Sequence, residues 1–175
     1  MAGLRKGNCY SRKVERPYTR FSKYKARNFV KGVPPSKVAR FESGNPFMKY
    51  THRVDLVAVN SVQVRHNSLE SGRQVVTRRL ELGLNKAFLI KLRAHPHHIL
   101  RENKILSGAH SDRIGTGMAH SFGKPTGTAA QVHNGKIMFS VYVNVEGIEK
   151  AKEALKMAPA RMPGRYTIEV HEHKK

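Results

Sequence analysis

The chain has 175 residues and a formal net charge of +21, because 33 Lys and Arg residues face 12 Asp and Glu residues. Self-repulsion on this scale requires a polyanionic partner. No run approaches the roughly 18 apolar residues of a membrane-spanning helix, so nucleic acid is favoured and no membrane partner is expected. The single cysteine, Cys9, excludes an internal disulfide framework, and an aromatic content of 7% argues against a dedicated single-strand binder.

The first fifty residues carry thirteen Lys or Arg residues against two acids, a balance of +11. Aromatic residues interleave with these charges, namely Tyr10, Tyr18, Phe21, Tyr24, Phe29 and Phe41. This pattern can hold an extended arm on RNA by stacking as well as by charge, so we interpret residues 1–50 as a basic RNA-binding extension packed on the core. A disordered basic tail is the alternative. The cations assigned to RNA binding are Arg5, Lys6, Arg12, Lys13, Arg16, Arg20, Lys23, Lys25, Arg27 and Lys31.

A strand and a helix are predicted at the start of the core, which we assign to residues 51–175. Apolar and polar residues alternate over 53–66, which predicts a half-buried strand, or two strands with a bend near Asn60. The helix that follows has Asn67 as its candidate cap and Glu70 three residues on, as in a capping box. Its apolar residues fall on one stripe, formed by Leu69, Val76, Leu80 and Leu84.

The second half of the core is predicted to contain strands and a further helix. Residues 86–96 read as a mostly apolar strand after the helix ends at Gly83 to Asn85. Residues 127–144 predict a β-hairpin, because Asn134-Gly135 is a strong signal for a type I′ turn between two alternating segments.

A second helix and a closing strand complete the core. The helix is predicted from Val145 to Ala158, with an ion pair from Glu146 to Lys150 and Pro159 as its stop. Residues 165–173 then predict the last strand. The order of elements predicts an α+β, two-layer sandwich of an antiparallel or mixed sheet with two helices on one face, a long glycine-rich loop and the basic extension.

The glycine-rich loop is the stretch around which the chain is organised. Between Ser107 and Thr126 there is no helical or strand period, and a segment of this length inside a compact domain is functional or disordered. We interpret residues 103–126 as a functional loop that faces RNA. In the alternative, Asp112 and Arg113 pair with each other or with Glu102 to hold a local turn.

Enzymatic and metal chemistry are poorly supported by the motifs in this region. The HPHH run at residues 95–98 has zinc-like spacing, but Glu102 is the nearby acid available to complete four ligands. Residues 117–126 resemble a phosphate-binding P-loop, yet they place five residues rather than four before the Gly-Lys pair. They also have Pro125 where a hydroxyl should bind magnesium. We therefore expect no metal, no cofactor and no catalytic residue.

Several motifs in and around the loop resemble those of a ribosomal protein family. They are Pro96-His97-His98, Arg101-Glu102-Asn103-Lys104, Gly108-Ala109, Asp112-Arg113, Thr116-Gly117-Met118 and Phe122-Gly123-Lys124-Pro125. The family is the large-subunit ribosomal protein called "ten-e" in archaea and eukaryotes, homologous to bacterial "sixteen". The match extends to both ends of the chain, at Cys9-Tyr10, Pro17-Tyr18-Thr19-Arg20, Phe29 to Pro34 and Pro163-Gly164. Its length is similar to that of archaeal members, and Ala119-His120 and Tyr166 depart from the family's usual residues.

The resemblance implies a place on the cytoplasmic ribosome. It implies a fold lodged between segments of 23S-type rRNA, with 5S rRNA, tRNA and neighbouring ribosomal proteins as further partners, and a role in translation and late subunit assembly. It also implies that the loop points towards the peptidyl-transferase centre and bound tRNA, through Arg101, Lys104, His110, Arg113, Met118, His120 and Lys124. A free-standing RNA-binding or ribosome-assembly factor is the alternative, and an enzyme using His97 or His98 ranks third.

Overall fold

The computed structural model describes residues 8–11, 22–28, 30, 32–102 and 123–172. In chain order its elements are α1 (Asn8–Ser11), η1 (Lys25–Arg27), β1 (Glu42–Gly44), β2 (His52–Ala58), β3 (Val62–Arg65), α2 (His66–Leu84), β4 (Leu89–Leu92), β5 (His98–Glu102), β6 (Lys124–Val132), β7 (Ile137–Val143), η2 (Val145–Gly147), α4 (Ile148–Lys156), η3 (Pro159–Arg161) and β8 (Tyr166–Glu172). The α+β class and its two main helices, α2 and α4, were both expected from the sequence.

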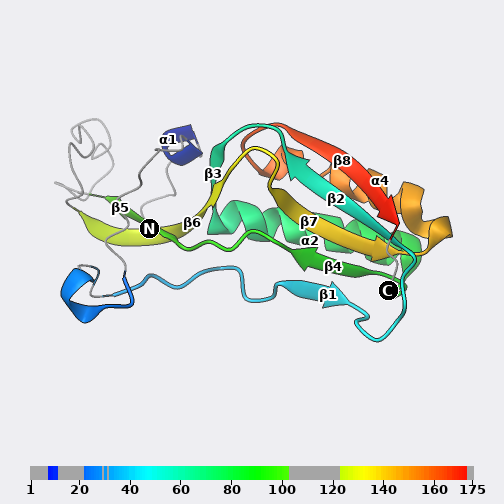
Figure 1. The fold of residues 1–175 in the computed structure, drawn as a ribbon, viewed down its shortest axis with the longest axis horizontal. Helices are drawn as coiled ribbons and strands as arrows, with labels where there is room; N and C mark the ends of the chain where they lie inside the picture. Colours follow the sequence, from blue (N-terminus) through cyan, green and yellow to red (C-terminus); the bar gives the residue numbers. More distant parts are fainter. Residues whose placement is uncertain (1–7, 12–21, 29, 31, 103–122, 173–175) are drawn as a thin grey trace.

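The strands form two antiparallel sheets rather than the one sheet expected (Figure 1). The larger sheet has the order β1-β4-β7-β2-β8, and the smaller has the order β3-β6-β5. The predicted bend near Asn60 is confirmed, because β2 ends at Ala58 and β3 begins at Val62. This bend carries the chain from the larger sheet into the smaller one.

The predicted hairpin at residues 127–144 is wrong, although a turn does lie at Asn134-Gly135. Strand β6 pairs with β3 and β5, whereas β7 pairs with β2 and β4. Gly135 has a positive φ of 76°, but Asn134 does not, so the turn is not type I′. The Gly135 N–H donates to the Ala58 carbonyl at 2.8 Å, and this bond holds the turn at the end of β2 while the flanking strands enter different sheets.

The helix α2 begins and ends close to the predicted positions, but its predicted cap is wrong. Arg65 precedes the helix without a side-chain capping bond, and Asn67 lies inside the first turn. Glu70 binds Arg73 and Gln74 instead of capping the backbone. The helix ends as expected, with Asn85 at φ 51°. The predicted stripe is buried, as Leu69, Val76 and Leu80 are inaccessible and Leu84 is partly covered.

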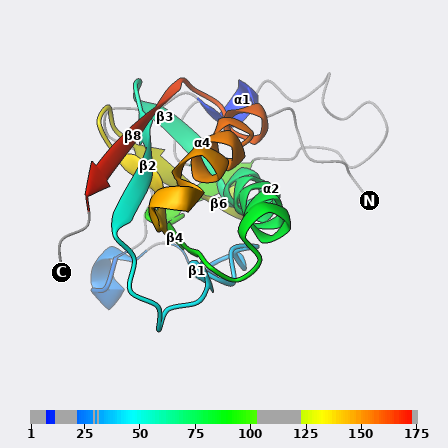
Figure 2. The ribbon, with the colours of Figure 1, turned by 90° about the vertical axis from the view of Figure 1, so that its right-hand side faces the viewer.

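The second helix is shorter than predicted, because residues 145–147 form the separate 3-10 turn η2. The expected pair from Glu146 to Lys150 does not form, since the Lys150 ammonium donates to the Gly83 carbonyl at 2.8 Å and so links α4 to the end of α2. Both helices lie on the same side of the larger sheet, as expected (Figure 2). The core between the layers includes Leu56 of β2 and Phe139 of β7.

Strand β1 and the first residues of β6 fall within segments that were expected to have other roles. Strand β1, inside the predicted extension, pairs with β4 and forms the edge of the larger sheet. Strand β5 pairs with β6 from His98 opposite Ala129 to Glu102 opposite Lys124. The predicted loop 103–126 therefore ends three residues early, because residues 124–126 are part of β6. Residues 103–122 lie outside the described part of the chain.

Candidate nucleic-acid interface

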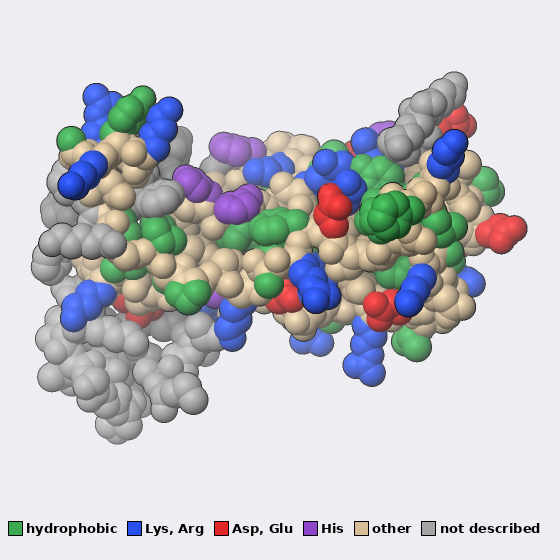
Figure 3. All heavy atoms as spheres, turned by 90° about the horizontal axis from the view of Figure 1, so that it is seen from below, with side chains coloured by type: hydrophobic (Ala, Val, Ile, Leu, Met, Phe, Trp, Pro, Cys, Tyr) green, Lys and Arg blue, Asp and Glu red, His purple; other side chains and the backbone are tan. Residues whose placement is uncertain are grey.

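A cluster of exposed cations lies around η1, at the end of the molecule that also carries β5 and β6 (Figures 1 and 3). The Lys23 ammonium lies 5.2 Å from the centroid of the Tyr24 ring, and the Arg27 guanidinium carbon lies 5.8 Å from it. The Tyr24 N–H donates to the Ser22 hydroxyl, and the Arg27 N–H donates to the Tyr24 carbonyl. These contacts hold the cations, together with the exposed Lys25, in a defined arrangement that suits phosphate binding.

Seven of the ten cations predicted to bind RNA lie outside the described residues: Arg5, Lys6, Arg12, Lys13, Arg16, Arg20 and Lys31. Residues 32–40, in the described part of the extension, add two exposed cations outside that set of ten, Lys37 and Arg40. No acid occurs between residues 22 and 40, so the segment is uniformly cationic.

Two of the aromatic residues expected to stack on RNA contact the protein itself instead. The Arg65 guanidinium of β3 lies 5.2 Å from the centroid of the Tyr10 ring, and the Gln63 side chain donates to the Tyr10 carbonyl at 2.6 Å. Phe41 stacks on His95 with the ring centroids 5.4 Å apart. The interleaved pattern therefore serves in part to attach the extension to the core, because these rings find partners within the chain.

The histidines of the HPHH run differ in exposure. His95 and His97 are exposed, with ring centroids 6.5 Å apart, and Pro96 between them is buried. In the view from below, histidine side chains gather near the end of the molecule that carries the cations around η1 (Figure 3). His98 is half-buried, and desolvation, with Arg101 and His97 nearby, lowers its pKa to about 4. His98 is therefore neutral near pH 7 and cannot offer a positive charge to phosphate.

His66 joins the cationic segment to the smaller sheet, a contact that sequence reasoning missed. The Lys37 N–H donates to Nδ1 of His66 at 2.9 Å, so the neutral ring carries its proton on Nε2. Burial, followed by the charges of Lys37 and Arg65, lowers the pKa of His66. Gly127 of β6 lies against the same ring, since a Cβ there would come within 3.3 Å of Nε2.

The base of the glycine-rich loop is fixed by the pairing of β5 with β6. In this register Arg101 lies opposite Pro125, and Lys124 lies opposite Glu102. The structure thus brings Arg101 and Lys124 to the same end of the two-stranded ribbon, where Lys124 is exposed and Arg101 is half-buried. The other loop residues predicted to face RNA, namely Lys104, His110, Arg113, Met118 and His120, lie outside the described residues.

The described residues contain neither a metal-binding cluster nor a membrane-spanning helix. No group of three or more His, Cys, Asp or Glu side chains in this part of the chain is arranged to hold a metal ion. No helix there is long and apolar enough to cross a bilayer. Two exposed acids are paired with cations, Glu42 with Lys91 and Glu153 with Arg79.

The fold and surface define a class of protein: a small α+β protein with a strongly cationic segment attached to one end, suited to a polyanionic partner. Comparisons with known proteins identify the family within that class. The family model described as ribosomal protein L16p/L10e matches residues 15–169. The chain therefore belongs to this family of ribosomal proteins, as the motifs had indicated, and it is a structural protein rather than an enzyme.

Three relatives, each named large ribosomal subunit protein uL16, are similar over most of both chains. The protein from Staphylothermus marinus is 41% identical over 161 residues, covering 91% of this chain and 89% of the relative. That from Saccharolobus islandicus is 39% identical over 170 residues, covering 95% and 92%. That from Hyperthermus butylicus is 37% identical over 161 residues, covering 89% and 86%.

Proposed function

We propose that this chain is a constituent of the large ribosomal subunit that binds 23S-type rRNA through residues 1–50. In this proposal it also directs the loop 103–126 towards the peptidyl-transferase centre and bound tRNA, and so supports translation and late subunit assembly. The observation that carries the proposal is the family match over residues 15–169, together with relatives named as large-subunit proteins. The charge of +21 supplies the physical reason for an RNA partner.

The arrangement of the described elements supports separate roles for the basic extension and the loop. The cations around η1 and the ribbon β5–β6 lie at one end of the molecule, whereas α4 and the C-terminal end of β8 lie at the other (Figure 1). The two ends of the loop lie on this ribbon, at the end of the molecule away from α4. The core can then stay rigid against rRNA while the loop reaches a different ligand.

The loop residues have separate roles in this proposal. Arg113 is assigned a fork-like contact to phosphate, because its guanidinium can engage two oxygens. Lys124, at the start of β6, is assigned a point-charge contact next to Pro125. His110 and His120 add hydrogen-bond donors, and Arg101 holds the base of the ribbon opposite Pro125.

Co-sedimentation with large subunits separates this proposal from a free-standing RNA-binding or assembly factor. A subunit constituent should remain with the large subunit at one copy per particle through a high-salt wash. An assembly factor should be found free, or below one copy per particle and on immature particles. The second result would contradict the proposal, whereas equal copy number on mature subunits would support it.

The salt dependence of rRNA binding tests the cationic segment itself. If about six phosphates are neutralised, log K should fall with log salt at a slope of about −4 to −5. Replacing Lys23, Lys25 and Arg27 with Gln should make the slope shallower by about 2 to 3, at about 0.7 to 0.9 for each phosphate that is no longer neutralised. The matched control replaces the exposed Lys86 and Lys156, which lie outside this segment, and should leave the slope close to that of the unaltered protein. Equal slopes for all three proteins would contradict the role of η1.

A further inference from the structure

A hollow of about 520 Å³ opens on the face of the larger sheet opposite the helices. Its position follows from side-chain alternation, because Ile90 of β4 and Val141 of β7 point into the core while their neighbours point outwards. The hollow is lined by Pro46, Met48, Lys49, Tyr50, Leu89, Lys91 and Tyr142. Tyr50, Leu89 and Tyr142 form a small buried cluster of their own, so the floor of the hollow is firm and mostly apolar.

The loop that forms one wall of the hollow is held in place by three hydrogen bonds around Asn45. The Asn45 N–H donates to the Phe88 carbonyl at 2.8 Å, and the Tyr50 hydroxyl donates to the Asn45 carbonyl at 2.7 Å. The Phe47 N–H donates to the Asn45 side chain at 3.0 Å. Phe47 is thus positioned by an ordered loop, yet its side chain is 94% exposed. An ordered loop that presents an aromatic ring to solvent loses little further entropy when a planar ligand stacks on that ring.

The charges beside the hollow are mainly positive. Lys49 is exposed on its wall, and Lys91 lies 6.0 Å from the centroid of the Tyr142 ring while pairing with Glu42 at 2.8 Å. Arg93 donates to the Tyr142 hydroxyl at 2.7 Å. Three cations therefore surround an aromatic floor with one acid among them. The surface seen from below has hydrophobic groups beside Lys and Arg side chains (Figure 3).

We propose that this hollow and Phe47 bind two consecutive unpaired nucleotides of RNA. One base enters the hollow over Met48 and Tyr142, its neighbour stacks on Phe47, and the phosphate between them meets Lys49. This inference rests on the proposed function, because it assumes that the chain binds rRNA, and it adds a site away from the basic extension and the loop. An unpaired RNA segment combines flat base faces, which can stack on the aromatic residues, with phosphates, which can bind the lysines.

Binding of a short single-stranded RNA carrying 2-aminopurine tests the site in the full chain, with a duplex of the same length as comparison. Phe47→Ala should lower the affinity for the single strand roughly fivefold to a hundredfold, the effect expected of one base stack. It should also remove the fluorescence quenching of 2-aminopurine, and leave duplex affinity and thermal unfolding unchanged. Phe47→Tyr should restore both the affinity and the quenching. Lys49→Gln should reduce the salt slope by about one.

The matched control is Leu82→Ala. Leu82 lies on α2 and is another exposed apolar residue, at 75% exposure. This variant should leave single-strand affinity unchanged. The inference is overturned if Phe47→Ala and Leu82→Ala bind the single strand equally well with equal quenching. It is also overturned if Phe47→Ala binds RNA normally but attaches poorly to subunits, because the partner is then a protein. In either case normal co-sedimentation of the unaltered chain would leave the proposed function standing.

Discussion

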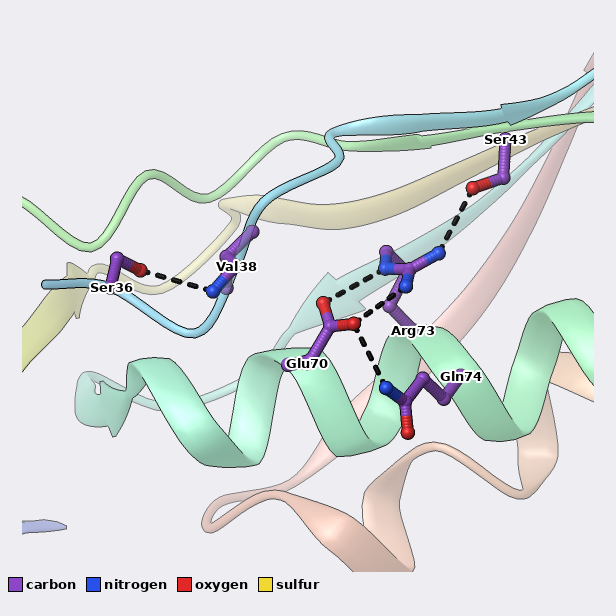
Figure 4. Close-up of polar contacts among 6 residues, drawn as sticks. All are labelled: Ser36, Val38, Ser43, Glu70, Arg73 and Gln74. Carbon is purple, nitrogen blue, oxygen red and sulfur yellow. Dashed lines mark hydrogen bonds and ion pairs between the residues drawn. The ribbon is translucent and has the colours of Figure 1, made fainter.

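Replacing Arg73 should destabilise the fold far more than replacing another arginine of the same helix. Arg73 binds both carboxylate oxygens of Glu70, at 2.9 and 2.6 Å, and also donates to the Ser43 hydroxyl at 2.9 Å (Figure 4). The Glu70 and Arg73 side chains are 15% and 13% exposed. Because Ser43 belongs to β1, this arginine ties α2 to the edge strand of the larger sheet.

The size of the effect follows from burial and geometry. Breaking a fully buried ion pair by removing one partner costs about 3–5 kcal/mol, because the remaining charge is left unpaired. Glu70 retains some access to water, so we expect Arg73→Ala to lower the free energy of unfolding by about 2 kcal/mol. For a domain of this size that corresponds to a fall in Tm of about 4 to 8 °C. Arg73→Lys should recover only part of the loss, because an ammonium cannot form the fork.

Arg79→Ala is the matched control, since Arg79 pairs with Glu153 at 3.3 Å on the surface. Those two side chains are 51% and 60% exposed. An exposed pair of this kind contributes about 0–1 kcal/mol, so the two alanine variants should differ clearly in urea unfolding of the full chain. The salt concentration must be held constant, because the chain carries a high net charge.

The pH dependence provides a second measurement on the same pair. The hydrogen bonds from Arg73 lower the pKa of Glu70, so the carboxylate contributes stability above its unfolded pKa and loses it as pH falls through the folded pKa. The difference between the unaltered protein and Arg73→Ala should therefore shrink as the pH falls below about 4. The reasoning would be refuted if Arg73→Ala were no more destabilising than Arg79→Ala near pH 7, or if their difference did not change on acidification.

Three further outcomes are expected. Because burial lowers the pKa of His98 to about 4, the unfolded chain takes up a proton on this ring before the folded chain does, so stability should be lost as the pH falls from 7 to 5. His98→Phe should reduce that loss in urea unfolding, and an unchanged pH profile would contradict the assignment. Replacing residues 103–122 with a short Gly/Ser linker should leave Tm within a few degrees, because β5 and β6 pair independently of them; loss of cooperative unfolding would show otherwise. Arg113→Ala should slow tRNA positioning or subunit maturation while the protein stays folded and incorporated, whereas normal maturation with Asp112→Ala destabilising the isolated protein would favour the local-turn alternative.

Local periodicity was enough to predict the elements in which buried side chains recur every few residues. The stripe on α2 and the alternation in β2 and β3 are visible in the sequence, because side-chain direction is fixed by backbone geometry alone. The end of α2 could also be predicted, since asparagine adopts a positive φ, as Asn85 does, more easily than most residues. The motifs of the glycine-rich loop identified the family, which the comparisons then confirmed.

Tertiary structure decided which partner each strand and side chain takes. The Asn134-Gly135 signal predicts a turn, but pairing depends on β2, some eighty residues earlier, and this is why β6 and β7 separate into two sheets. A capping box at Asn67 and Glu70 is locally reasonable, yet Arg73 competes for the same carboxylate with a stronger, charge-assisted bond.

The hollow on the outer face of the larger sheet could not be predicted from local sequence either. Phe47 follows Asn-Pro in a run that reads as an ordinary turn, and nothing in its neighbourhood along the chain indicates a hollow. One wall of the hollow comes from the loop after β1, and its floor includes Leu89 and Tyr142. Both residues lie more than forty residues further along the chain than Phe47, and more than fifty residues separate them from each other. A sequence determines what each segment can bury or expose. The long-range packing of strands determines which side chains meet, because those contacts depend on a backbone arrangement that no short window of residues contains.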